Sequence, residues 1–165
     1  MTNWKQLART TLMSTVISSL GTTAASAWCG QRENKNALAP LNAVSHILWG
    51  EEAASQERFS AKYTLAGVAL NASAMLGWAL VFAYLFDKLR GDERAAAKSK
   101  SRKVAAGLLG GVATSALAYV VDYHVVPKRL TPGLEDRLPL RSLLLVYIVL
   151  ALSLGAGGVL SRESE

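Results

Sequence analysis

The sequence predicts an all-α membrane protein, a four-helix transmembrane bundle with a structured outer loop that contains a short interfacial helix. Charged residues make up only 18% of the 165 residues, below the roughly 25% that is usual in soluble domains. They are absent from 65–85 and from 104–121. A bilayer core about 30 Å thick needs about 20 helical residues. Four apolar stretches approach that length and leave room for one domain, residues 1–165, with spans at 10–28, 63–86, 104–126 and 142–160.

The first span, 10–28, has hydroxyl groups on one flank and apolar side chains on the other. Residues four apart lie along one helix face. Ser and Thr can bond carbonyls of their own helix and allow close helix contact, so we expect a structural role; the alternative is the wall of a polar cavity. The hydroxyl residues form two neighbouring rows: Thr10, Ser14, Ser18, Thr22 and Ser26, then Thr11, Thr15, Ser19 and Thr23.

The second and third spans carry residues suited to helix contacts. Asn71 lies within 63–86 and can hydrogen-bond to a neighbouring helix, which contributes on the order of 1 kcal/mol. In the third span, Gly107 and Gly111 are four apart, so a neighbouring backbone can approach closely. Pro127 disfavours helical geometry at the residue before it, and the third span should therefore end near Val126.

The fourth span begins after Pro139, since proline fits the first turn of a helix. It is the most apolar of the four, with leucine, isoleucine and valine along most of 143–152. We therefore expect it to have the largest lipid-facing area. Three glycines, Gly155, Gly157 and Gly158, narrow its far end.

Basic residues set the expected orientation. The linker 87–103 holds seven Lys and Arg residues, whereas four basic residues in the first loop are balanced by four acidic ones. The positive-inside rule then predicts a multi-pass protein of the bacterial inner (plasma) membrane with both termini cytoplasmic; four further basic residues in the opposite loop weaken the asymmetry. The N-terminal stretch also resembles a signal peptide, but its apolar centre is short and we expect a retained helix.

The segment 39–50 is apolar for a loop. Pro40 can begin a short helix and Gly50 can end it, which predicts an interfacial helix folded back over the mouth of the bundle. Its polar side chains would share the outer membrane face with residues from the end of the third span. The expected outer-face polar cluster comprises Asn42, Ser45, His46, Glu51, Asp122 and His124.

The chemistry of this cluster is open. The chain has no phosphate-binding loop, dinucleotide fingerprint, HExxH, CxxC or GxSxG motif, so we predict no catalytic residue and no cofactor, and do not favour an enzyme. We expect interfacial hydrogen bonding as the role of both histidines. His46 and His124 are weak candidates for a metal or for axial haem ligation, although Asp122 and His124, two apart on a helix, point in different directions.

Three segments resemble a group of small, uncharacterised proteobacterial inner-membrane proteins with four helices. They are Gly30-Gln31-Arg32-Glu33, the segment 39–50 and the segment 121–133. Together they cover about a third of the chain. The resemblance implies an inner-membrane setting and supplies no activity.

Three functions follow as hypotheses. The leading one is a non-enzymatic accessory subunit or assembly factor that acts through protein partners, or as a homo-oligomer, among membrane lipids. The second is a small transport or ligand-binding bundle that uses the Ser/Thr face of the first helix. The third is a metal- or haem-binding membrane enzyme at the outer face. No nucleic-acid-binding signature accompanies the net charge of +6, so we expect no nucleic-acid partner.

Overall fold

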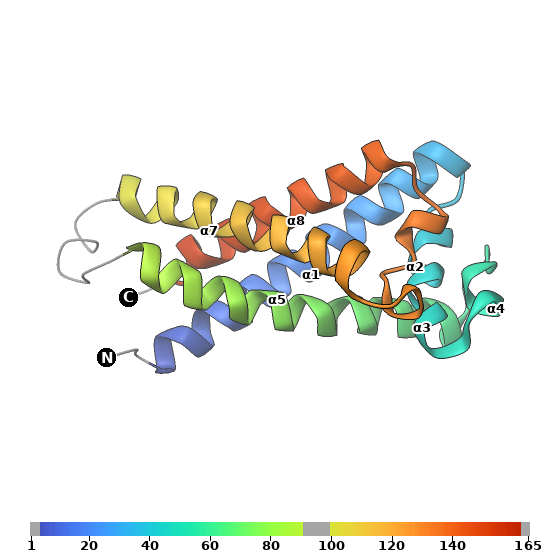
Figure 1. The fold of residues 1–165 in the computed structure, drawn as a ribbon, viewed down its shortest axis with the longest axis horizontal. Coiled ribbons are helices and arrows are strands. Elements are labelled where there is room, and N and C mark those ends of the chain that lie inside the picture. The colour runs from blue at the N-terminus through green and yellow to red at the C-terminus, as the bar shows by residue number, and fades with distance from the viewer. Residues whose placement is uncertain (1–3, 91–99, 163–165) are drawn as a thin grey trace.

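The computed structural model describes residues 4–90 and 100–162, and within these ranges the chain forms helices and no strands. The predicted all-α class is confirmed. Four long helices alternate in direction along the molecule (Figure 1). Three of them are longer than the apolar stretches that predicted them, and the third in chain order is shorter, because its last turn is π-helical. The four helices are α1 (Trp4–Asn34), α5 (Ala66–Arg90), α7 (Lys100–Val120) and α8 (Leu140–Leu160).

Three helical stretches are long and apolar enough to cross a membrane: Ala61–Leu89, Lys100–Val125 and Leu140–Leu160. The first two extend α5 and α7 by π-helical turns over Ala61–Leu65 and Val121–Val125. The helix α1 is not among them, although its 31 residues would extend about 46 Å at 1.5 Å per residue. Its two rows of Ser and Thr lower its hydropathy.

The first hydroxyl row of α1 faces the interior, whereas Thr15, Ser19 and Thr23 of the second row are only partly buried. Ser14 and Ser18 are completely buried, and the Ser14 hydroxyl donates a hydrogen bond to the Leu154 carbonyl of α8 at 3.2 Å. A Cβ added at Gly157 would lie 2.5 Å from the Cα of Ser14, so the two backbones touch here. The Ser/Thr face is therefore a close helix contact along most of its length.

Small residues also bring α7 and α8 together, as the Gly107 and Gly111 spacing predicted. A Cβ added at Gly107 would lie 3.0 Å from the Gly155 carbonyl oxygen, and one added at Gly111 would collide with the Ala151 carbonyl oxygen. One turn further along, the Ser115 hydroxyl donates to the Tyr147 carbonyl at 2.6 Å. The predicted glycine contact in the third span is confirmed.

The helix α5 packs against α1 and α7 and has little contact with α8. Its Asn71 amide donates to the hydroxyls of Thr22 and Thr23 on α1, at 3.0 and 3.2 Å. Nearer the other end, Phe82 and Phe86 stack with their ring centroids 5.5 Å apart in the main apolar core. The predicted interhelical role of Asn71 is confirmed.

The segment 39–50 folds back over one end of the long helices, as expected. It forms two short helices rather than one, α2 (Ala39–Val44) and α3 (His46–Trp49), followed by α4 (Glu51–Ala54). A Cβ added at Gly67 of α5 would collide with the Leu41 carbonyl oxygen, so α2 rests directly on α5. We call 39–49 together with the loop 126–139 the cap, and this end of the molecule the cap end.

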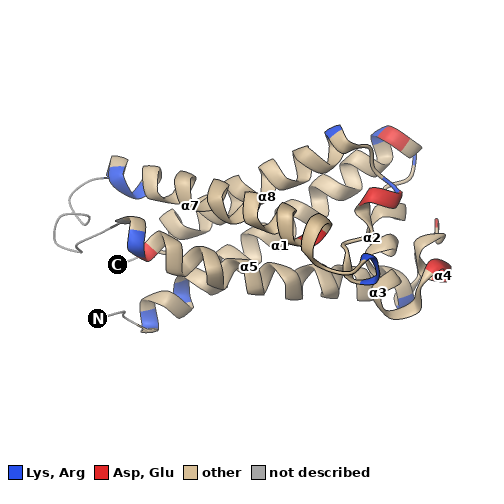
Figure 2. Cartoon of the chain, in the orientation of Figure 1, with Lys and Arg blue, Asp and Glu red and all other residues tan. Residues whose placement is uncertain are grey.

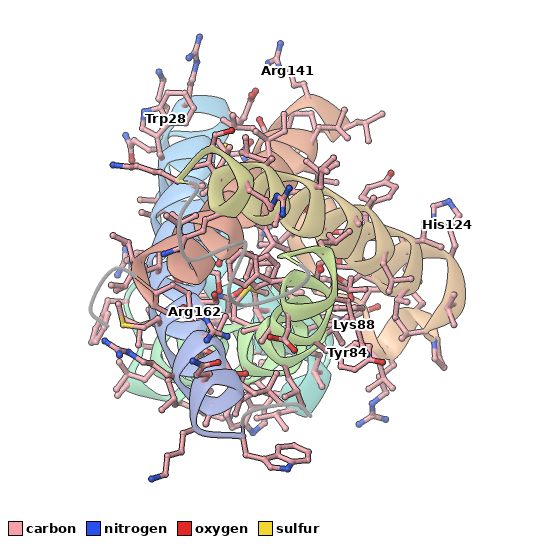
Figure 3. All side chains as sticks on the ribbon, turned by 90° about the vertical axis from the view of Figure 1, so that its left-hand side faces the viewer. Trp28, Tyr84, Lys88, His124, Arg141 and Arg162 are labelled. Atoms are coloured by element: carbon pink, nitrogen blue, oxygen red, sulfur yellow. The ribbon has the colours of Figure 1, made fainter. Side chains whose placement is uncertain are left out.

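The two ends of the molecule differ in their balance of basic and acidic residues (Figure 2). The opposite end, which we call the basic end, has seven described basic side chains and one acidic one, Asp87. Figure 3 looks onto this end, where Arg162 forms an ion pair with Asp87 at 3.8 Å. The basic side chains are Lys5, Arg9, Lys88, Lys100, Arg102, Lys103 and Arg162.

The cap end carries eight basic and seven acidic residues. Arg141, at the start of α8, pairs with Glu33 at the end of α1 with an Nη2–Oε2 distance of 2.6 Å. Hydrogen bonds from Arg141 and then from the Ser142 hydroxyl hold the pKa of the Glu33 carboxyl below its usual value. This pair ties α1 to α8 where they meet the cap.

Candidate functional site

Two hollows lie at the cap end, one above the other. The outer basin, of about 880 Å³, opens between α3, α4 and the loop 128–137. The central cavity, of about 120 Å³, lies beneath the cap and is bounded by α1, α5 and α8 and by the end of α7. Parts of α3 and of the loop 130–134 separate the two.

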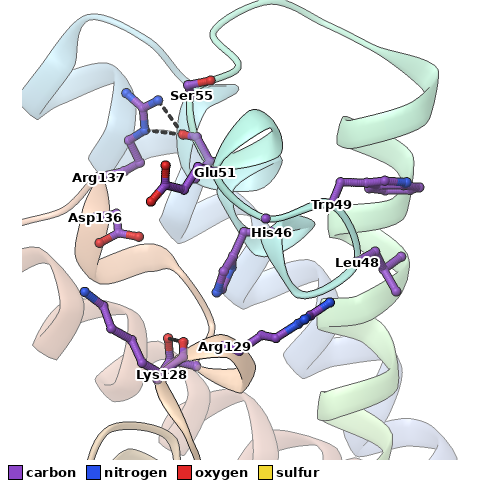
Figure 4. Close-up of a pocket in the computed structure, with 12 residues that line it drawn as sticks. His46, Leu48, Trp49, Glu51, Ser55, Lys128, Arg129, Asp136 and Arg137 are labelled. Carbon is purple, nitrogen blue, oxygen red and sulfur yellow. Dashed lines mark hydrogen bonds between the residues drawn. The ribbon is translucent and has the colours of Figure 1, made fainter.

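The outer basin has a mixed-charge wall (Figure 4). Arg137 is fixed there because its guanidinium donates to the Ala54 carbonyl, with an Nε–O distance of 2.8 Å, and lies 3.8 Å from the Glu57 carboxylate. Lys128 and Arg129 are exposed on the opposite rim. The basin therefore presents both signs of charge to solvent.

Of the six residues in the expected outer-face cluster, His46 and Glu51 line this basin. The His46 Nδ1 lies 2.9 Å from the Ala43 carbonyl oxygen. It also abuts Gly133, where an added Cβ would lie 2.6 Å from Nδ1. The imidazole is thus a contact between α3 and the loop, whereas Glu51 lies exposed on the rim.

Asn42 and Ser45 lie in the cap but do not line this basin. They are fully buried. The Asn42 amide donates to the carbonyls of Gln56 and Arg58, and its oxygen accepts a hydrogen bond from the Thr64 hydroxyl at 2.6 Å. Asn42 therefore satisfies backbone groups of the loop that leads into α5.

Asp122 and His124 sit in the π-helical turn that ends α7 and point to different sides. Asp122 lines the central cavity, where its Oδ2 accepts a hydrogen bond from the Tyr147 hydroxyl at 2.6 Å. His124 is exposed at the periphery, with its ring 5.8 Å from that of Tyr119 (Figure 3). The structure does not bring His124 and His46 into contact, because one faces outward and the other is held by the cap.

The metal and haem hypothesis used His46 and His124 as its ligands. Within residues 4–90 and 100–162, no three His, Cys, Asp or Glu side chains lie close enough together to hold a metal ion. A protein metal site typically needs at least three such donors. The two histidines therefore have no third ligand among the described side chains.

Sequence reasoning missed Tyr147 as a residue of the candidate site. Its ring packs against Tyr119 and Tyr123 with centroid separations of 5.3 and 6.0 Å, and its hydroxyl meets Asp122. A signal was available, since a phenol hydroxyl in the most apolar span must find a polar partner. No comparable signal marked the basic residues of the basin, because the path of the loop 126–139 brings them there and this path cannot be read from the sequence.

No protein-family model matches the chain, and no curated protein or solved structure is significantly similar to it.

Proposed function

We propose that this chain is a four-helix transmembrane protein of the bacterial inner membrane that acts as a non-enzymatic accessory subunit. Membrane insertion is also supported for α1, because its polar side chains face the interior of the protein and its apolar side chains face outward. Its first hydroxyl row is buried and its second is mostly half-buried, while Leu12, Val16 and Leu20 are 62%, 56% and 68% exposed. The hydrocarbon core of a membrane offers hydroxyl groups no hydrogen-bond partner, whereas it accommodates leucine and valine side chains. This arrangement therefore suits a helix whose outer side faces lipid.

The proposed orientation places the basic end in the cytoplasm. Its seven described basic side chains oppose only one acidic side chain, whereas charges nearly cancel at the cap end. Lys and Arg near membrane spans resist translocation. Both the start of α1 and the end of α8 then lie on the cytoplasmic side.

Cysteine labelling should test this orientation. We would remove the single native thiol with Cys29→Ser and introduce Ser55→Cys at the cap end or Ser101→Cys at the basic end; both serines are exposed. In intact cells, an impermeant maleimide should label position 55 and leave position 101 unlabelled until the cells are broken. The opposite pattern would invert the proposed topology.

The support for a partner comes from the outward face of α5. This helix belongs to the least buried of the three apolar stretches. In its most apolar segment, 22% of the residues are buried inside the protein, compared with 39% and 44% in the other two. Three small residues spaced by four, Ala69, Ser73 and Gly77, are exposed on it. The Ser73 hydroxyl donates to the Ala69 carbonyl at 2.9 Å, so it leaves the face smooth.

Gly77 is the observation that carries the proposal. Ten glycines lie inside the four long helices, and an added Cβ would touch a neighbouring segment at nine of them. At Gly77 it would touch nothing within 4 Å. Glycine in a helix interior costs up to about 1 kcal/mol relative to alanine, and small residues on membrane helices permit close approach of another helix. Gly77 thus suits a helix of a partner protein, or of a second copy of this chain.

Gly77→Leu should test the partner surface. In mild detergent, the wild-type protein should elute as a complex of defined mass with a second protein or a second copy. The variant should elute as the lone chain with an unchanged melting temperature, because position 77 has no internal contact. Val112→Leu, on the exposed face of α7, is the matched control and should leave the complex intact. A complex that survives Gly77→Leu would refute this surface.

A further inference from the structure

We propose that the central cavity is a binding site for a small organic ammonium ion, that is, a protonated amine on a short apolar body. This site is separate from the outward face of α5 and does not depend on the partner proposal. Every long helix and both parts of the cap contribute to its wall. Ten apolar and four polar residues line it, the polar ones being Thr22, Asn71, Asp122 and Tyr147.

The polar groups of the wall offer acceptors, because their donors are already used. The Tyr147 hydroxyl donates to Asp122, the Thr22 hydroxyl donates to the Ser18 carbonyl, and the Asn71 amide nitrogen donates to Thr22 and Thr23. Within the described part of the chain, the Asn71 carbonyl oxygen and the second Asp122 oxygen make no hydrogen bond. A ligand that complements this wall must therefore donate hydrogen bonds.

The charge of the wall selects a cation. Asp122 has no Lys, Arg or His within ion-pair distance among residues 4–90 and 100–162; the basic residues of the neighbouring loop, Lys128 and Arg129, point into solvent at the basin. Carboxylates inside membrane proteins are costly and are commonly functional. An ammonium group beside Asp122 would supply both the missing charge and the missing donor.

The size and lining of the cavity select a short apolar body. A volume of about 120 Å³ is slightly below that of an engineered cavity of about 150 Å³ that holds benzene in another protein. Met75, Val146 and Leu150 are buried apolar residues of its wall. A bare metal ion would find too few oxygen ligands here, and an anion would be repelled by the carboxylate. An amine with a body of about five carbon atoms fits both the volume and the charge.

Binding of cyclopentylamine to the purified full-length protein in detergent should test the site. Equilibrium dialysis at neutral pH should show one saturable equivalent of the amine. Asp122→Asn should weaken this binding at least tenfold, whereas Glu51→Gln, which alters a carboxylate outside the cavity, should leave it unchanged. Cyclopentanol, the neutral analogue, should bind wild type and Asp122→Asn equally.

A second variant keeps the test decisive if Asp122→Asn folds poorly. Val146→Phe enlarges a buried side chain of the cavity wall and leaves the carboxylate in place, and it should abolish saturable binding while the protein keeps its helical circular dichroism. Non-saturable uptake by micelles alone would overturn the proposal. Equal affinity of the amine for wild type and a folded Asp122→Asn variant would overturn it too, as would full binding to a folded Val146→Phe variant.

Discussion

Replacing Gly111 with leucine should lower the free energy of unfolding by about 3 kcal/mol or more, because the added side chain has no room. The first atom of that side chain would already collide with the Ala151 carbonyl oxygen. That oxygen belongs to the backbone of α8 and cannot rotate away. The two helices would have to separate along the seam that Gly107, Gly111 and Ser115 form with α8. We would measure the loss by thermal unfolding in detergent.

Val112→Leu is the matched control for Gly111→Leu. Val112 lies one position further along α7, with 59% of its surface exposed, and its replacement is also leucine. We expect its melting temperature to stay close to that of the wild type. If both variants melted alike, the contact between α7 and α8 would not hold the fold together as described.

The long helices could be predicted because their signals are local. Charge-free stretches, the spacing of Gly107 and Gly111, and the position of Pro127 each depend on neighbours in sequence, and these predictions agree with the structure. The hydroxyl rows of α1 were also visible. Their burial, however, depends on α8, since Ser14 meets Leu154 across 140 positions in the chain.

The candidate site was harder to predict because the cap brings together distant residues. Asn42 resembles a surface residue in sequence, yet it binds the carbonyls of Gln56 and Arg58 and becomes buried. Asp122 was recognised, whereas its partner Tyr147 lies on another helix. Asp122 and His124 are two positions apart on a helix and therefore point in different directions. The cap holds His46 away from both. Contacts between residues so far apart in the chain leave no periodic pattern in the sequence.

Gly133→Ala should open the cap and expose the central cavity. Gly133 adopts a φ of +74°, which costs other residues roughly 1–2 kcal/mol. An added Cβ would also lie 2.7 Å from the Ala43 carbonyl oxygen and 2.6 Å from the His46 Nδ1. The methyl group should push the loop 130–134 away from α2 and α3, and the two contributions together should cost about 3 kcal/mol. A cysteine at Val44, which is buried in the cavity wall, should then react at least tenfold faster with a thiol reagent in the Cys29→Ser background.

Gly50→Ala separates the backbone effect from the collision. Gly50 also has a positive φ, +65°, but an added Cβ would touch nothing within 4 Å. Its substitution should lower the melting temperature through backbone strain alone and leave the labelling rate at position 44 unchanged. If Gly50→Ala accelerated labelling as much as Gly133→Ala, the opening would reflect general loss of stability. The contact of Gly133 with Ala43 and His46 would then not be what closes the roof of the cavity.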